Sequence, residues 1–397
     1  MKRWQLVLWW WELILALAQV AVSVILMSSL VRMNILKWQW IVLIGVGLLV
    51  LLVLTILPLF FRKKPIIAWR IVGMIVSVTV LTGGVFALRY VNAFNGFLDK
   101  ITIQSSEVSG ESGSEETKIV EKKVTDEPFI IYISGSDSRT SVDDPGARSD
   151  VNIIAVVNPN KHKILLASIP RDTYVQLHGT TGLKDKLTHA GLAMYGPDMS
   201  KLTLEDFLGI KIDYTVKVSF DTVVGVVDEL GGIEIYSDTK LWLNSESKQH
   251  PGKYCYFDVG TQWVDGDCAL RFARERKSYY TGDRHRGENQ QEVLTGIVDK
   301  LTSSRDYILR LPAILEIVGD SFITSFSREA ITDFISFQLN EQVNWQIERA
   351  NLDGEGALLE TYTYVDDNLR WVMIPDEESL QNMKDKINEF LMVEDEA

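Results

Sequence analysis

The chain has 397 residues, enough for a membrane anchor together with one or two folded domains. Its formal net charge of -13 at pH 7 argues against a nucleic acid partner, because binding to a phosphate backbone requires a basic surface. Apolar residues make up 46% of the chain but concentrate before residue 95, so the composition combines an apolar N-terminal part with a soluble remainder.

Three long apolar runs open the chain, over residues 6–31, 41–61 and 66–88. Each is close to or longer than the roughly 20 residues that a helix needs to cross a bilayer. A cleaved signal peptide is the alternative for the first run, but two further runs follow it and no small-residue cleavage site stands out. We therefore predict a three-helix transmembrane anchor over residues 1–95. The third run contains Arg70 near one end, from where its side chain can extend to the lipid headgroups.

The distribution of basic residues predicts the orientation of this anchor. One side of the membrane is expected to carry Lys2, Arg3, Arg62, Lys63 and Lys64, and the other Arg32, Lys37 and Arg89. Because the side richer in lysine and arginine stays in the cytoplasm, the N-terminus is expected inside the cell. Everything after the third span is then expected outside, attached to the cell membrane.

A flexible linker is predicted over residues 96–125. Its centre, residues 105–117, reads SSEVSGESGSEET and contains no aromatic residue. Such a polar, acidic stretch cannot bury enough apolar surface to fold, so it is expected to act as a tether.

Residues 126–397 have the pattern of a mixed α/β domain. Short β-rich runs predict three central strands, covered on both faces, at 129–134, 151–158 and 163–169. Two more strands are expected at 214–218 and 233–236. Apolar residues at three- and four-residue spacing predict helices around 190–195, 202–208, 220–230, 289–301 and 378–391. Gly231 and Gly232 are expected to end the third of these helices. The predicted fold class is α/β: a mixed central sheet flanked by helices, preceded by three transmembrane helices.

The two cysteines, Cys255 and Cys268, lie in the part predicted to be outside the cell, where a disulfide can persist. Their spacing is compatible with a disulfide, but also with two buried thiols, because the sequence contains no information on the geometry between them.

Charged residues stand at the ends of the three central strands. Asp137 follows the first strand in SGSDSR, Arg148 and Asp150 precede the second in ARSD, and Arg171 follows the third in SIPRDT. Any one of them alone is better explained as a solvated loop charge or a helix cap. If the strands are neighbours, however, these side chains converge at one edge of the sheet, which is where open α/β sheets bind ligands.

A second cluster lies in the stretch RERKSYYTGDRHRGENQQ, which leads into the helix predicted at 289–301. It contains Arg274, Arg276, Asp283, Arg286 and Gln290. A guanidinium group binds two phosphate oxygens at once, and a helix N-terminus adds backbone donors. A basic surface loop is the alternative, but it does not explain the interleaved acidic and amide side chains.

Together the two clusters offer carboxylates for a divalent cation and arginines for phosphate groups. Mg²⁺, or Mn²⁺ in its place, uses one or two carboxylates and completes its shell with water and phosphate oxygens, so Asp137 and Asp150 suit it. Arginines around metal-bound phosphates are typical of phosphoryl transfer. No zinc site competes, because neither the five histidines nor the two cysteines have a zinc-ligand spacing.

These segments, in their order along the chain, resemble the LytR–CpsA–Psr domain. The resemblance spans about residues 129–301 and rests on SGSDSR, RSD before a strand, SIPRDT, KLTHA, VDELGGIEI and ALRFARERK followed by GDRHRGENQQEV. Each motif is moderately specific, whereas the ordered set is highly specific. Three spans before the domain resemble the streptococcal capsule branch of the family. That branch often has an accessory domain after the anchor, and here only the short linker stands in that place.

The resemblance implies a membrane enzyme of a Gram-positive bacterium that transfers a polyprenyl-(pyro)phosphate-linked glycopolymer to peptidoglycan. The glycopolymer would be a capsular polysaccharide or a teichoic acid, and its lipid tail would lie in an apolar tunnel between sheet and helices. Candidate lining residues of this tunnel, each of which ordinary core packing would also explain, are Ile154, Leu166, Val223, Val227, Val293, Leu294 and Ile297. Asp137 and Asp150 match the family's Mg²⁺-binding aspartates. The positions that match its pyrophosphate-binding arginines and other polar site residues are Arg148, Arg171, Arg274, Arg276, Arg286, Asp283 and Gln290.

Two other functions fit the same residues. A non-catalytic polyprenyl-phosphate binder that regulates capsule assembly would use the arginines and would not need the aspartates, and capsule-assembly proteins would be its partners. A polyprenyl-diphosphate hydrolase would need the metal site but no acceptor groove, and pyrophosphatase chemistry is also expected as a side activity of the transferase.

Overall fold

The structure is a computed structural model, and it describes residues 3–57, 66–109, 122–136, 149–192, 198–244, 254–280, 282–304, 314, 317, 322–364 and 368–392. The chain divides into two compact units, residues 1–99 and 100–397. Each unit has its own packing and is described separately below.

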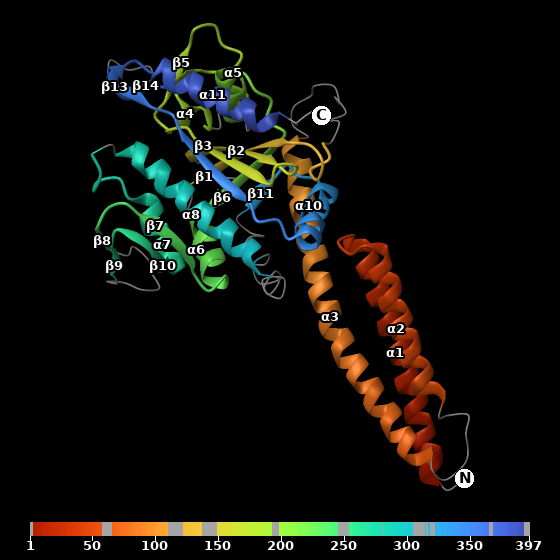
Figure 1. Ribbon diagram of the computed structural model, residues 1–397. Helices are drawn as coiled ribbons and strands as arrows, with labels where there is room; N and C mark the ends of the chain where they lie inside the picture. The colour runs from red at the N-terminus through yellow and green to blue at the C-terminus, as the bar shows by residue number, and fades with distance from the viewer. Residues whose placement is uncertain are drawn as a thin grey trace. The chain divides into compact units, whose positions relative to one another are not determined.

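The first unit contains long apolar helices (Figure 1). They are α1 (Arg3–Met33), α2 (Trp38–Ile56) and α3 (Ile66–Ser109). Each includes a stretch that is long and apolar enough to cross a membrane, namely Trp9–Met33, Trp38–Ile56 and Trp69–Gly96. The three apolar spans predicted from the sequence are thus confirmed as helices, while their orientation in a membrane stays a prediction.

Polar side chains of these helices pair with one another. Arg70 on α3 lies 3.2 Å from Glu12 on α1, and both side chains are largely buried, whereas the expected reach of Arg70 to the lipid headgroups stays a prediction. The buried Gln19 accepts hydrogen bonds from Thr55 on α2 at 3.3 Å and from Ser77 on α3 at 3.1 Å. Because unpaired polar groups are costly inside a bilayer, these contacts favour one arrangement of the three helices.

Helix α3 continues past the predicted end of the anchor at residue 95 and reaches Ser109. The first part of the predicted linker is therefore helical. Extending an existing helix adds one hydrogen bond for each residue fixed, so a polar stretch can remain helical without a core of its own. Residues 110–121 of the predicted linker lie outside the described residues, and the predicted domain boundaries remain predictions.

The second unit is built on a six-stranded sheet in the order β11-β6-β1-β2-β3-β12. Its strands are β1 (Phe129–Ser136), β2 (Ser149–Asn158), β3 (Lys163–Ser168), β6 (Tyr214–Ser219), β11 (Phe322–Thr324) and β12 (Gln346–Asn351). The pairs β1–β6 and β3–β12 are parallel, whereas β1–β2, β2–β3 and β6–β11 are antiparallel. The three strands predicted to be central are central, and the sheet is mixed as expected.

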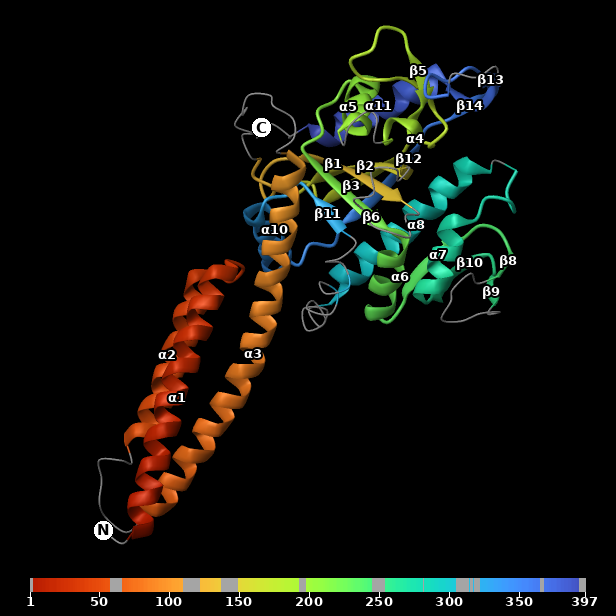
Figure 2. The same ribbon diagram turned by 180° about the vertical axis from the view of Figure 1, so that it is seen from behind.

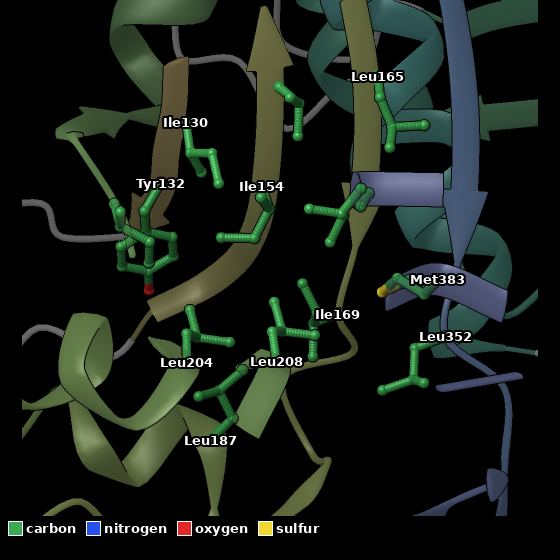
Figure 3. Close-up of a cluster of buried hydrophobic side chains, with 14 of the residues drawn as sticks. Ile130, Tyr132, Ile154, Leu165, Ile169, Leu187, Leu204, Leu208, Leu352 and Met383 are labelled. Carbon is green, nitrogen blue, oxygen red and sulfur yellow. The ribbon is translucent and has the colours of Figure 1, made fainter. Parts of the chain in front are cut away.

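Helices cover both faces of this sheet (Figures 1 and 2). One face packs against α4 (Leu187–Ala190), α5 (Met199–Leu208) and α11 (Glu377–Leu391), and the other against α8 (Asp283–Ser303) and α10 (Arg328–Glu341). Figure 3 shows the first face, where Ile130, Ile154 and Leu165 meet Leu204 and Met383. Since side chains alternate along a strand, two covered faces explain the nearly continuous apolar runs in the sequence.

A second layer packs outside α8. It consists of two antiparallel strand pairs, β7 (Ile233–Ser237) with β10 (Gly260–Val264) and β8 (Leu241–Asn244) with β9 (Tyr254–Phe257), and of α6 (Phe220–Glu229) and α7 (Gly266–Arg274). The strand predicted at 233–236 exists, but it pairs with β10 and does not join the central sheet. A disulfide between Cys255 and Cys268 links β9 to α7, which resolves the alternative that the sequence left open.

The predicted glycine stop of α6 is confirmed. The helix ends at Glu229, and Gly231 and Gly232 follow with φ of 75° and 92°. A Cβ at position 232 would lie 2.2 Å from the indole of Trp263, whose Nε1 donates a hydrogen bond to the carbonyl of Gly231 at 3.1 Å. Both the backbone conformation and the close approach of this ring therefore require glycine.

Sequence periodicity missed α7 and α10. It also missed the strands β8 to β12 and the strands β4 (Tyr174–Gln176), β5 (Lys184–Lys186), β13 (Gly354–Leu359) and β14 (Arg370–Pro375). The helix predicted at 190–195 is instead α4, which ends at Ala190, and residues 193–197 lie outside the described part of the chain. Strands of three residues are too short to show an alternation of apolar and polar side chains, which explains part of this difference.

Candidate functional site

Several strand ends meet at one edge of the central sheet. Strands β1, β3, β6 and β12 end there and β2 begins there, as the parallel and antiparallel pairings require. Asp150 is the second residue of β2, Arg171 follows β3 closely, and Phe220 starts α6 directly after β6. The strand-end residues predicted to share one edge are thus brought together where the structure describes them. Asp137 and Arg148 lie outside the described residues.

Helices bring the second predicted cluster to the same edge. Arg274 is the last residue of α7, and α8 begins at Asp283 rather than at the predicted residue 289. Asp283, Arg286 and Gln290 therefore lie on the first two turns of a helix and not in a loop. Their spacings of three and four residues place them on one face of α8.

The two clusters form a pocket of about 190 Å³. It is lined by Asp150, Arg171, Phe220, Arg274, Arg276, Arg286 and Gln290. Four guanidinium groups face a single carboxylate among these residues, so the pocket is strongly positive on a chain whose net charge is negative. A positive pocket of this size is suited to a compact, multiply charged anion such as a diphosphate.

Two ion pairs organise the charges around this pocket. Nη1 of Arg171 lies 2.5 Å from a carboxylate oxygen of Asp150, and Nη2 of Arg286 lies 2.8 Å from one of Asp283. Burial by itself lowers the pKa of Arg171, but the hydrogen bond that its guanidinium donates to Asp150 and the nearby carboxylates outweigh burial and raise that pKa. Arg171 is therefore held fully charged in the site.

The pair Asp283–Arg286 behaves differently, because burial dominates for both groups. Burial raises the pKa of the Asp283 carboxyl, although Arg286 and Arg171 oppose the shift. Burial likewise lowers the pKa of Arg286. A carboxylate with a raised pKa is a better proton acceptor near neutral pH than an ordinary aspartate, so Asp283 has the property required of a general base.

Sequence reasoning missed the side chains that hold Arg171 in place. Nζ of Lys186 lies 2.8 Å from Oδ1 of Asp172, and Oδ2 of Asp172 lies 3.7 Å from Nε of Arg171. The amide of Thr188 also donates a hydrogen bond to the carbonyl of Arg171 at 2.9 Å. The segment KLTHA thus fixes the turn after β3, and its distance in sequence from SIPRDT hid this connection.

Other residues of the second cluster position α8 and do not line the pocket. The buried Gln291 donates hydrogen bonds to the carbonyls of Leu166 on β3 and Ala350 on β12, at 2.8 and 2.9 Å. A Cβ at Gly287 would lie 2.5 Å from Oγ of Ser168, so glycine allows α8 to approach the end of β3. The interleaving of glycine and amide side chains with the arginines in RGENQQ therefore reflects the packing of this helix.

Phe220 is a further lining residue that the sequence suggested only as a helix start. Its ring centroid lies 5.1 Å from Cζ of Arg274, a cation–π contact that orients the guanidinium group at the end of α7. Asn289 on α8 ties the same helix end down, because its amide donates a hydrogen bond to the carbonyl of Phe272 at 3.0 Å.

The described part of the pocket offers one suitable ligand for a hard divalent cation, the carboxylate of Asp150. Asp150 lines the pocket, and Mg²⁺ needs only one or two carboxylates when phosphate and water complete its shell. Within the described residues, no group of three or more His, Cys, Asp and Glu side chains is arranged to hold a metal ion without such help. Asp137, the other predicted ligand, lies outside the described residues.

The residues suggested for an apolar tunnel do not all lie on one side of the central sheet. These residues are Ile154, Leu166, Val223, Val227, Val293, Leu294 and Ile297. Ile154 packs with α5 and α11 on one face of the sheet, Leu166 and Leu294 pack on the opposite face, and the other four belong to the core around α7. They therefore cannot all line one channel, and ordinary core packing accounts for Ile154.

This fold and pocket define an α/β protein with an arginine-rich anion site, preceded by three helices of membrane-spanning length. The LytR_cpsA_psr family model matches residues 97–389, so the chain belongs to the LytR–CpsA–Psr family, as its motifs indicated.

Several proteins similar to this chain are named as transferases. Over 238 residues the chain is 32% identical to the polyisoprenyl-teichoic acid–peptidoglycan teichoic acid transferase TagU of Bacillus mycoides strain KBAB4, a match that covers 60% of this chain and 72% of that protein. The crystal structure of TagV from B. subtilis is 28% identical with a TM-score of 0.53, and covers 68% of this chain and 98% of that one. TagT bound to LIIa-WTA is 26% identical with a TM-score of 0.53, and covers 71% and 98%.

Proposed function

We propose that this protein transfers a polyprenyl-(pyro)phosphate-linked glycopolymer to peptidoglycan on the outer side of the cell membrane. The observation that carries the proposal is the convergence of four arginines, Asp150 and Gln290 in one pocket at the edge of the sheet. The names of the relatives favour a teichoic acid as the glycopolymer. A capsular polysaccharide is the second candidate, because three membrane-length helices precede the domain.

In this proposal the arginines bind the non-bridging oxygens of the diphosphate. Arg171 and Arg286 are fixed by carboxylates, and Arg274 by the ring of Phe220, so their charges are already in place before the substrate arrives. Such pre-oriented charge stabilises the transition state more than it stabilises the substrate. Removing one such group typically costs about 10²–10³-fold in rate.

The reaction forms one bond and breaks one. A hydroxyl oxygen of a peptidoglycan sugar bonds to the phosphorus that carries the glycopolymer, the bond from that phosphorus to the bridging oxygen breaks, and polyprenyl phosphate leaves. The hydroxyl proton passes to Asp283, whose buried carboxyl has a raised pKa. Asp150, with Asp137 as the predicted second ligand, would hold Mg²⁺ or Mn²⁺, which would supply positive charge beside the diphosphate when bound.

The test uses the full-length chain in detergent, a polyprenyl-diphosphate-linked teichoic acid precursor, Mg²⁺ and soluble peptidoglycan strands. Arg286→Ala is expected to reduce attachment of the polymer by at least about 10²-fold. Arg284→Ala is the matched control, because Arg284 lies on the same turns of α8 but pairs with Asp353 at 2.6 Å and does not line the pocket.

Each alternative function gives a different outcome in this assay. If the lipid is cleaved in the presence of peptidoglycan but no polymer is attached, the protein is a diphosphate hydrolase. If the lipid is bound and never processed, the protein is a binder that regulates assembly. Equal rates for Arg286→Ala and Arg284→Ala would show that the pocket is not the active site.

A further inference from the structure

Of the four arginines that line the pocket, Arg276 has the least direct support. Two of the others pair with carboxylates, and the third lies against an aromatic ring. Within the part of the chain that the structure describes, no ion pair or ring contact holds the guanidinium group of Arg276, and its side chain is exposed. Its place in the pocket therefore depends on how the backbone of the segment between α7 and α8 is held.

A local turn orders the first part of this segment. Glu275, which follows α7, is buried, and one oxygen of its carboxylate accepts hydrogen bonds from the amides of Lys277 and Ser278 at 2.6 and 2.9 Å. The amide of Glu275 donates a hydrogen bond to the carbonyl of Phe272 at 3.1 Å. These contacts fix the backbone of Arg276 relative to α7, but they do not join it to α8, which carries other lining residues of the pocket.

An aromatic stack makes the connection to α8. The ring of Tyr279, three residues after Arg276, lies on the ring of His285 with centroids 3.5 Å apart and planes at 22°. The hydroxyl of Tyr279 also accepts a hydrogen bond from the side-chain amide of Asn289 at 3.4 Å. His285 and Asn289 are one turn apart on α8, and the pocket residue Arg286 lies between them in the chain. The segment is thus tied to the same part of α8 that lines the pocket.

Two carboxylates hold the ring of His285 in the plane of this stack. Its Nδ1 lies 3.2 Å from an oxygen of Glu288 on the same helix, and its Nε2 lies 3.5 Å from an oxygen of Asp238, which follows β7. A flip of the ring would exchange both nitrogens for carbons and give up both contacts. His285 therefore offers Tyr279 a surface that does not turn.

These ion pairs contribute little to stability, because their carboxylates are open to solvent. The side chains of Asp238 and Glu288 are 55% and 34% exposed, and Arg284 is a second partner of Glu288 at 3.6 Å. Water and salt screen pairs of this kind. The main effect of His285 is therefore expected on the position of Tyr279 and not on the free energy of unfolding.

We propose that His285 positions Arg276 for the diphosphate by stacking on Tyr279. His285 does not line the pocket, so it is a positioning residue that acts through the segment carrying Arg276. A guanidinium group binds a phosphate through two parallel hydrogen bonds, and these weaken steeply when the groups are misaligned. The inference rests on the diphosphate site of the proposed function, but it does not require transfer to peptidoglycan.

The test measures the affinity of the full-length chain in detergent for farnesyl diphosphate in the presence of Mg²⁺. His285→Ala removes the ring, and we expect about ten-fold weaker binding, equivalent to ~1.4 kcal/mol. His285→Phe keeps a ring for Tyr279 without the ion pairs, so it is expected to restore most of the affinity. Arg284→Ala is the matched control, because it removes another partner of Glu288 from the neighbouring position, and its binding is expected to be unchanged.

A double-mutant cycle separates positioning from a general structural effect. If His285 acts through Arg276, His285→Ala should weaken binding by less than about two-fold once Arg276 is replaced by alanine, because residues that act together are not additive. In the Arg171→Ala background the same substitution should still weaken binding about ten-fold, since Arg171 is held by Asp150 and not by this stack. Equal thermal unfolding of His285→Ala and Arg284→Ala shows that the fold is retained.

The outcomes are distinct. Wild-type affinity in His285→Ala, equal weakness of the alanine and phenylalanine variants, or additive losses with Arg276→Ala would each show that the proposal is wrong. If the wild-type chain does not bind the probe, the pocket is not a diphosphate site, and the proposed function and this inference fail together. If the cycle shows the coupling but no polymer is ever attached to peptidoglycan, His285 positions Arg276 as proposed and only the transferase function fails.

Discussion

The pair Lys186–Asp172 is expected to hold the turn that carries Arg171, and Lys186→Met tests this directly. Nζ of Lys186 lies 2.8 Å from Asp172, and the two side chains are only 16% and 14% exposed. Methionine keeps the length of the side chain and removes its charge. Asp172 would then face the pocket edge with a buried charge and no lysine partner.

The size of the effect follows from this burial. Removing one partner of a buried ion pair costs about 3–5 kcal/mol, whereas exposed pairs contribute about 0–1 kcal/mol. For the small residual exposure of Lys186 and Asp172 we expect a loss of about 2–3 kcal/mol. In a domain of this size each kcal/mol shifts Tm by about 2–4 °C, so the melting temperature should fall by about 4–12 °C.

The assay is thermal unfolding of the full-length chain, with a double-mutant cycle that adds Asp172→Asn. The control is Lys163→Met, because Lys163 pairs with Glu348 at 3.3 Å with side chains that are 34% and 45% exposed, and its loss should cost under about 1 kcal/mol. Binding of the lipid substrate should also weaken in Lys186→Met, since Arg171 loses its alignment. A coupling energy below about 0.5 kcal/mol, or equal losses for the two lysine variants, would refute the reasoning.

Three further predictions concern single residues. Asp283 must be ionised to accept a proton, and burial raises its pKa, so attachment of the polymer should slow as the pH falls through that raised pKa. The Asp283→Asn variant should be slow at every pH, and its pH–rate profile should lack this acidic limb. Asp185 is fully buried, and although burial raises its pKa, the hydrogen bonds from His189 and Thr363 outweigh that effect and lower it. The ionised Asp185 should stabilise the fold above its ordinary pKa of 3.8, and this stabilisation should disappear as the pH falls through the lower pKa of the folded state. Urea unfolding at several pH values should show that the Asp185→Asn variant lacks this pH-dependent part of the free energy of unfolding. Gly266→Ala should lower the free energy of unfolding by about 1–3 kcal/mol in the same assay, because the added Cβ would lie 2.2 Å from the carbonyl oxygen of Val224. An equally stable variant would show that α6 and α7 can move apart easily.

Much of the fold could be predicted where the signal is local and long. The membrane-length helices follow from unbroken apolar runs. The central strands follow from short, nearly continuous apolar stretches, which are typical of strands in a sheet that is covered on both faces. The stop of α6 at Gly231 and Gly232 is equally local, because only glycine readily takes the backbone conformation found there. The start of α8 at Asp283 was missed since charged residues without an apolar stripe give no helical period.

The candidate site was predicted as a set of residue types, and the order of motifs assigned them to a family. The sequence by itself determined which residues carry the charge, namely Asp150, Arg171, Arg274, Arg276 and Arg286, because their chemistry and motif context do not depend on packing. It could not show that Lys186 holds Asp172, that Gly287 lets α8 approach β3, or that Phe220 orients Arg274. These contacts join segments far apart in the chain.

Tertiary structure alone decided those contacts, and likewise the pairing of Cys255 with Cys268 and the stacking of Tyr279 on His285. The physical reason is that the energy of a contact depends on the distance between side chains in space. A sequence specifies that distance only through the packing of the whole domain, and each strand and helix is placed by apolar burial shared among many residues.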